Sequence, residues 1–199
     1  MSKMYAFIAK YGVIKVLLFL FIPGLVAGVI FANAFQSLYI DQFFLFDDSY
    51  VESVTTVQLD QLILFQMALL KYLKEFFLMG LLSTTIIGIP CLFLHNFYKG
   101  FCIGFIISTA TMRFGIQGIL FFLCYCMPHY LLLGPLWVYM YYKGIALNQA
   151  LYQKTETHSV RFSKYIPIIL VVLIIIGIAS YLEASINAGL MKKIMLSLY

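Results

Sequence analysis

Two cysteines and a histidine crowd into six residues near the middle of the chain, within the stretch LCYCMPHYLLLGP (residues 123–135). Cys124, Cys126 and His129 are residue types that bind zinc, and a cysteine beside a histidine can also act as a nucleophile with its base. A structural zinc site needs four ligands, and a catalytic one needs about three and a water. On a helix Cys124 and Cys126 point roughly 200° apart, so only Cys126 and His129 share a face. With two ligands and no carboxylate to orient the histidine, we expect no metal, no cofactor, no catalytic residue and no enzyme.

The same stretch predicts a helix that is interrupted by two prolines. Pro128 has no N–H, so the carbonyl of Cys124 loses its helical partner, and Pro135 repeats the effect one residue after a glycine. In lipid such a helix persists only where other groups bind the freed carbonyls. His129 is placed to do this, but an ionisable residue inside a membrane is also a functional-site candidate by default. Two interpretations of His129 therefore stay open, a structural hydrogen bonder between helices or part of a functional polar pocket.

The composition identifies the solvent of the chain as lipid. Of its 199 residues, 63% are hydrophobic and 11% are charged, and the mean hydropathy is +0.98. Soluble domains average about 45–50% apolar and about 25% charged residues. We therefore expect an all-α polytopic membrane protein that contacts membrane lipid. The net charge of +5 comes mostly from lysines scattered between apolar runs, so we expect orientation signals and no nucleic-acid partner.

About five transmembrane helices are expected, with the third and fourth short or broken, because each span needs about 20 apolar residues. A helix at residues 58–77 is expected to lie on the outer membrane surface and to run into the second span, and a polar turn is expected at 95–100. The sequence Ala32-Asn33-Ala34 leaves a cleaved signal peptide as an alternative to the first span. The expected spans are residues 16–35, 75–94, 100–114, 119–142 and 165–182.

The distribution of lysine and arginine predicts the orientation. With the N-terminus in the cytoplasm of a bacterial cell, the basic loop 143–164 lies inside and the acidic connector 36–74 lies outside. The alternative topology makes residues 97–116 a re-entrant hairpin. It would place the basic loop 143–164 outside, against the charge distribution. Glu183, at the end of the fifth span, is expected at the membrane interface, and a pairing with Arg113 at the outer face is the alternative.

Residues 97–135, FYKGFCIGFIISTATMRFGIQGILFFLCYCMPHYLLLGP, resemble the stage II sporulation protein M family. That family shows a K-G-x-x-x-G-F motif, a G-x-x-G turn and a Leu-Pro-His or Leu-Pro-Gln break. It ends on a span with a Glu-Ala pair. The Gly100–Gly104 spacing also lets helix backbones approach closely. Together with Pro135, the second proline of the fourth span, these motifs give the structural or functional motif residues. They are Lys99, Gly100, Gly104, Phe105, Gly115, Gly118, Pro128, His129, Pro135 and Glu183.

The resemblance implies a scaffold and not an enzyme. The sporulation member holds two peptidoglycan-degrading partners, the stage II sporulation proteins D and P, in the mother-cell membrane during engulfment. Another branch lies in gene clusters for circular bacteriocins, so a component of peptide export or immunity, working with an ATP-binding cassette, is the alternative. A homo-oligomer stays open. The candidate partner-binding residues are the connector acids Asp41, Asp47, Asp48, Glu52 and Asp60.

Overall fold

The computed structural model describes residues 2–35, 60–127, 129–152, 166–187 and 189, and every element in these ranges is a helix. The predicted all-α membrane class is confirmed. Three described helices, Val13–Ala34, Gly88–Phe114 and the segment Pro167–Ile186, are long and apolar enough to cross a membrane. The elements are α1 Ser2–Tyr11, α2 Val13–Ala34, α5 Gln61–Ser83, α6 Gly88–Phe114, α7 Ile116–Cys126, α8 His129–Tyr152, α9 Ile166–Leu182 and the π-helix η2 Glu183–Asn187.

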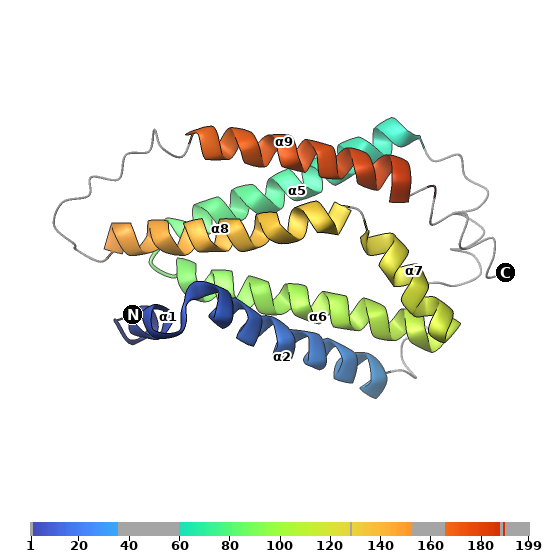
Figure 1. Ribbon diagram of the computed structural model, residues 1–199, viewed down its shortest axis with the longest axis horizontal. Helices are drawn as coiled ribbons and strands as arrows, with labels where there is room; N and C mark the ends of the chain where they lie inside the picture. The colour runs from blue at the N-terminus through green and yellow to red at the C-terminus, as the bar shows by residue number, and fades with distance from the viewer. Residues whose placement is uncertain (1, 36–59, 128, 153–165, 188, 190–199) are drawn as a thin grey trace.

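The five long helices lie along the long axis of the molecule and alternate in direction along the chain, with the short α7 between α6 and α8 (Figure 1). In that view α2 and α6 run to the right, α5 and α8 run to the left, and α9 runs to the right again. The helices α5 and α8 lie between α6 on one side and α9 on the other. If each long helix crosses the bilayer, the alternation gives the five passes that the sequence predicts.

The outer surface of the bundle is apolar on every long helix. Phe19 on α2, Phe77 on α5 and Leu131 on α8 are among many large apolar side chains that are exposed. Soluble monomers rarely show apolar surface this continuous, whereas in lipid it carries no penalty. The helices α5 and α8 have 23 and 24 residues, and about 20 residues reach across the hydrocarbon core. We therefore expect α5 and α8 to cross the membrane with the three more apolar helices.

The turn between the second and third spans is not where the sequence predicted it. Residues 95–100 lie inside the continuous helix α6, so the predicted limits 75–94 and 100–114 are wrong as helix limits. The turn occupies residues 84–87, where the Thr84 and Thr85 hydroxyls donate to the carbonyls of Leu81 and Leu82. Threonine competes in this way with the helical hydrogen bonds, and here it ends α5. The predicted surface helix 58–77 is consequently the first part of α5.

The predicted fourth span, 119–142, is two helices. Helix α7 ends at Cys126 and α8 begins at His129, while Pro128 lies outside the described residues. Pro135 lies inside α8, which continues past it, so the basic loop predicted at 143–164 begins no earlier than residue 153. The last turns of α8 are used to hold the α5–α6 turn. Asn148 Nδ2 donates to the carbonyls of Ser83 and Thr85, at 2.9 and 2.6 Å.

Glycines on both helices bring α2 and α6 together along their length. A Cβ atom at Gly24 or Gly28 would overlap backbone carbonyls of α6, and one at Gly100 or Gly104 would overlap carbonyls of α2. Each helix therefore has a G-x-x-x-G pair that faces the other, the arrangement by which helices pack closely in lipid. Asn96 adds a side-chain hydrogen bond of 2.7 Å to the carbonyl of Leu17. The α2–α6 pair is thus a close-packed unit on which α5 and α8 lie.

Candidate functional site

Of the cysteines and histidine in the central stretch, the structure describes the side chains of Cys126 and His129. His129 is 1% exposed, and its ring lies 4.5 Å from that of Tyr130 and 6.5 Å from that of Tyr72, between centroids. Cys126 is a half-buried free thiol, and the side chain of Cys124 is outside the described part of the structure. Among the described residues, no three His, Cys, Asp or Glu side chains gather as a metal site would require. His129 instead belongs to a row of aromatic rings inside the bundle.

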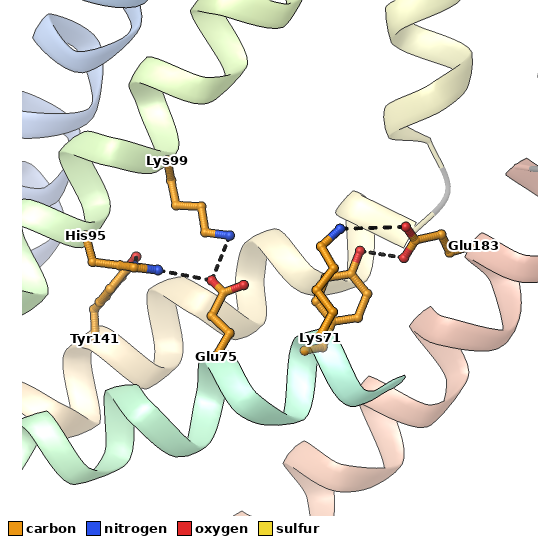
Figure 2. Close-up of polar contacts among 7 residues, drawn as sticks. Lys71, Glu75, His95, Lys99, Tyr141 and Glu183 are labelled. Carbon is orange, nitrogen blue, oxygen red and sulfur yellow. Dashed lines mark hydrogen bonds and ion pairs between the residues drawn. The ribbon is translucent and has the colours of Figure 1, made fainter. Parts of the chain in front are cut away.

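The most polar part of the described interior is a cluster that the sequence interpretation did not find. One carboxylate oxygen of Glu75 lies 2.7 Å from Lys99 Nζ and 3.2 Å from His95 Nε2. The other nitrogen of His95, Nδ1, is 2.7 Å from the hydroxyl of Tyr141. Figure 2 shows Lys99 and His95 reaching from α6 to Glu75 on α5, with Tyr141 behind them. We call Glu75, His95, Lys99 and Tyr141 the Glu75 cluster.

Helical spacing explains why these side chains meet. His95 and Lys99 are four residues apart on α6, so they lie on one face, and Tyr141 and Trp137 are related in the same way on α8. The ammonium of Lys99 lies 4.2 Å above the ring centroid of Trp137 and gains a cation–π contact there. Three helices thus each contribute side chains to one charge pair. The cluster therefore fixes the mutual register of α5, α6 and α8.

A buried charge pair of this kind is expensive to break. The side chains of Glu75 and Lys99 are 15% and 18% exposed, and both charges have been taken out of water. In a low-dielectric interior the attraction between them offsets their desolvation only while both are present. Ionisable residues inside a membrane pair with one another and mark functional sites by default. The Glu75 cluster is accordingly the candidate functional site.

A second polar contact joins α5 to η2, about one helical turn before Glu75. The hydroxyl of Tyr72 donates to Glu183 Oε2 at 2.6 Å, and Lys71 Nζ lies 3.9 Å from Glu183 Oε1. Figure 2 shows Lys71 reaching toward Glu183. The sequence left a pairing of Glu183 with Arg113 open as an alternative, and the structure places Tyr72 and Lys71 of α5 at the Glu183 carboxylate. The motif residue Glu183 thus holds the end of the last helix against the bundle.

Aromatic rings connect the two polar contacts. The ring of Trp137, which lies under Lys99, is 5.4 Å from the ring of Tyr130. Tyr130 contacts His129, and His129 contacts Tyr72, whose hydroxyl binds Glu183. The interior between α5 and α8 therefore holds a continuous row of polar and aromatic side chains. His129 lies in the middle of this row and is a candidate for coupling its two ends.

The other motif residues lie on helix contacts. Gly100 and Gly104 contact the backbone of α2, and the ring of Phe105 stacks on Phe101 at 6.4 Å and lies 6.3 Å from Phe31. Gly115 has φ +61°, a left-handed conformation that favours glycine, and it separates α6 from α7. A Cβ at Gly118 would overlap the carbonyl of Ala110. These residues shape the bundle, while Lys99 alone of the K-G-x-x-x-G motif joins the Glu75 cluster.

The acidic connector is described only at its end. Asp41, Asp47, Asp48 and Glu52 lie outside the described residues. Asp60 is the N-cap of α5, and its side chain accepts a hydrogen bond of 2.9 Å from the backbone N–H of Leu62. Asp60 was proposed as a partner-binding residue, and this contact gives it a structural role as well.

Substitution of Asp60 separates these two roles. We expect Asp60→Ala to destabilise the protein by about 0.5–2 kcal/mol, because the first turn of α5 loses its cap. Asp60→Ser keeps a capping oxygen but removes the charge, so its unfolding free energy should stay within a few tenths of a kcal/mol of the parent value. Chemical denaturation in detergent measures both. Equal losses for the two variants would contradict a capping role.

The residues that the sequence interpretation missed are Glu75, His95, Tyr141 and Trp137. Two signals could have found them. The stretch 58–77 has no glycine or proline and was expected to run as a helix into the second span, which already puts Glu75 inside a continuous helix. The spacing H-x-x-x-K at 95–99 is also a helix-face pattern, which was taken for a polar turn.

Comparison with known proteins identifies one family. The family model described as stage II sporulation protein M matches residues 17–187, which is most of the chain and includes the Glu75 cluster and Glu183. No curated protein and no solved structure matches the chain.

Proposed function

We propose that this chain, which belongs to the stage II sporulation protein M family, is a non-enzymatic membrane scaffold that holds peptidoglycan-remodelling proteins at the cell membrane during engulfment. The family match over residues 17–187 carries the proposal, and it makes the chain a sporulation-related membrane protein. The finer statements, namely the scaffold role, the partners and the stage, are the proposal itself.

The internal pairing of the polar groups supports a scaffold. All three carboxylates in the described part of the chain are engaged within it. Asp60 caps α5, Glu75 binds Lys99 and His95, and Glu183 binds Tyr72 and Lys71. Contacts that lock helices to one another suit a protein that presents a fixed surface. A rigid bundle of this kind holds its partners at a constant position relative to the membrane.

Partners are expected at the end of the bundle that carries the acidic connector. Helix α2 ends and α5 begins at the same end of the molecule, to the right in Figure 1, and η2 lies at that end too. Residues 36–59, with four of the five connector acids, join these two helices. We propose that partners bind at this end, on the outer side of the membrane.

A crosslinked pull-down tests the proposal. Tagged protein is taken from native membranes in mild detergent after brief crosslinking, beside a variant that carries Asp41→Asn, Asp47→Asn, Asp48→Asn and Glu52→Gln. We expect the parent to recover peptidoglycan hydrolases and the variant to lose most of them at an equal protein level. A parent that recovers no cell-wall hydrolase would contradict the scaffold.

The Glu75 cluster also favours a second candidate, a component of peptide export or immunity. Transporters have ionisable pairs and interrupted helices inside the membrane, and this chain has the Glu75–Lys99 pair and a break between α7 and α8. Under this candidate the pull-down recovers an ATP-binding cassette or a small hydrophobic peptide precursor. In that case Glu75→Gln should abolish export or immunity in protein that remains in the membrane.

A further inference from the structure

An apolar pocket of about 590 Å³ opens between α5, α8 and α9. Its lining is almost wholly aliphatic and aromatic, and includes Phe77, Leu81, Met140, Ile169 and Leu173. A pocket of this volume is within the range of about 300–1,000 Å³ that takes a small ligand. Because α5 and α9 expose apolar side chains around it, lipid tails are the surrounding medium. An acyl chain therefore fits the lining.

Two lysines are part of the otherwise apolar lining of the pocket. Lys74 of α5 and Lys143 of α8 both line it, and each lies about nine residues before the C-terminal end of its helix. Lys74 is next to Glu75 and Lys143 is two residues after Tyr141, and both Glu75 and Tyr141 contact His95, so the two lysines lie at a similar level of the bundle. A lysine side chain can carry its ammonium several ångströms toward the membrane surface. The pocket thus combines an apolar slot with two cations whose ammonium groups can extend toward the membrane face at which α5 and α8 end.

Neither cation has an acidic partner in the described part of the chain. The carboxylates of Asp60, Glu75 and Glu183 are used elsewhere, and the ammonium of Lys143 contacts only the rings of Tyr139 and Tyr142, at 5.6 and 6.0 Å. Two cations beside an apolar slot complement a molecule with one anionic head and an apolar tail. A partner helix would be apolar along its length and would leave both lysines without a counter-charge.

We propose that this pocket binds an anionic phospholipid, with an acyl chain between α5, α8 and α9 and the phosphate on Lys74 and Lys143. The pocket shares the side chain of Tyr141 with the Glu75 cluster but takes its cations from Lys74 and Lys143, and it does not depend on the scaffold proposal. Its occupancy would make the packing of α9 against α5 and α8 dependent on anionic lipid.

Native mass spectrometry of the delipidated full chain, titrated with phosphatidylglycerol or with phosphatidylcholine of the same acyl chains, tests the site. We expect the parent to bind phosphatidylglycerol more tightly. A lysine near anionic lipid contributes about 1 kcal/mol, which is roughly fivefold in affinity, so the pair Lys74→Gln with Lys143→Gln should weaken phosphatidylglycerol binding roughly 30-fold. Lys15→Gln on α2, an exposed lysine outside the pocket, is the matched control and should change little.

A second variant tests the apolar slot without touching charge. Gly80 lines the pocket, and a Cβ there meets nothing within 4 Å, so Gly80→Leu fills the slot without a clash at its Cβ. Leucine also favours the helix over glycine, so the variant should be no less stable than the parent. We expect it to weaken the binding of both lipids, whereas Gly177→Leu, at an equally open glycine outside the lining, should not. Three results would each overturn the proposal. The parent could bind the two lipids with equal affinity, Gly80→Leu could leave lipid binding unchanged, or a protein chain could occupy the pocket in place of lipid.

Discussion

Replacing Lys99 by methionine is expected to lower the free energy of unfolding by about 3–5 kcal/mol, because it leaves the buried carboxylate of Glu75 without its closest cation. Glu75→Gln should cost a similar amount, since Lys99 is then the unpaired charge. The double variant removes both charges and should be more stable than the sum of the single losses predicts. Steric trapping or denaturant unfolding in mixed micelles measures all three variants and the parent.

The double-mutant comparison decides whether the pair acts as a unit. Groups in direct contact show coupling of about 0.5–3 kcal/mol, and independent groups add within about 0.3–0.5 kcal/mol. Lys15→Met on α2 is the control, because Lys15 is exposed and outside the cluster, and it should change stability by no more than about 0.5 kcal/mol. Additive losses for Glu75→Gln and Lys99→Met would mean that the 2.7 Å contact contributes nothing specific to the fold.

The second large effect is expected at the contact between α2 and α6. A side chain at Gly104 would meet the carbonyl of Leu25, and a backbone carbonyl cannot turn aside as a side chain can. We therefore expect Gly104→Ala to cost at least about 3 kcal/mol, at the upper end of the usual cost of overpacking, and Gly28→Ala to cost a similar amount against Phe101. Thermal unfolding in detergent measures the loss.

Glycines elsewhere in the bundle supply the control for this prediction. A Cβ at Gly177 of α9 meets nothing within 4 Å, so Gly177→Ala removes only the flexibility of glycine. It should stabilise the protein by up to about 1 kcal/mol, because alanine is the better helix former. If Gly104→Ala were as harmless as Gly177→Ala, α2 and α6 would not be in the close contact described above.

Several features of the fold could be predicted because they depend on local chemistry. Apolar runs with no charge mark α2 and α9 within a few residues of their observed limits. The glycine at 115 marks the end of α6, since its left-handed conformation suits glycine. The break before His129 follows from the proline ahead of it in the sequence. The G-x-x-x-G spacing on α6 was visible as well, although its counterpart at Gly24 and Gly28 was overlooked.

The Glu75 cluster could not be predicted in the same way because its partners are distant in sequence. Sequence reasoning treated Glu75 as an interface residue and His95 to Lys99 as part of a loop, because charged residues usually lie outside the apolar core. Tertiary pairing overrode that rule, since each charge found its counter-charge on another helix. The helix ended instead at three small hydroxyl residues, Ser83, Thr84 and Thr85, which bind backbone carbonyls.

The central claim is that α5 and α6 cross the membrane with the Glu75 cluster between them, and cysteine accessibility tests it most directly. Ile86 in the 84–87 turn and Tyr98 in α6 have equal side-chain exposure, 57%, so protein burial does not distinguish them. In a background without the four native cysteines, Ile86→Cys and Tyr98→Cys are each treated with a membrane-impermeant maleimide from either side of the membrane. We expect the Ile86→Cys variant to be labelled from the N-terminal side only and the Tyr98→Cys variant to be protected from both sides by lipid. Labelling of the Tyr98→Cys variant, with protection of the Ile86→Cys variant, would place the turn at residues 95–100 and contradict the account.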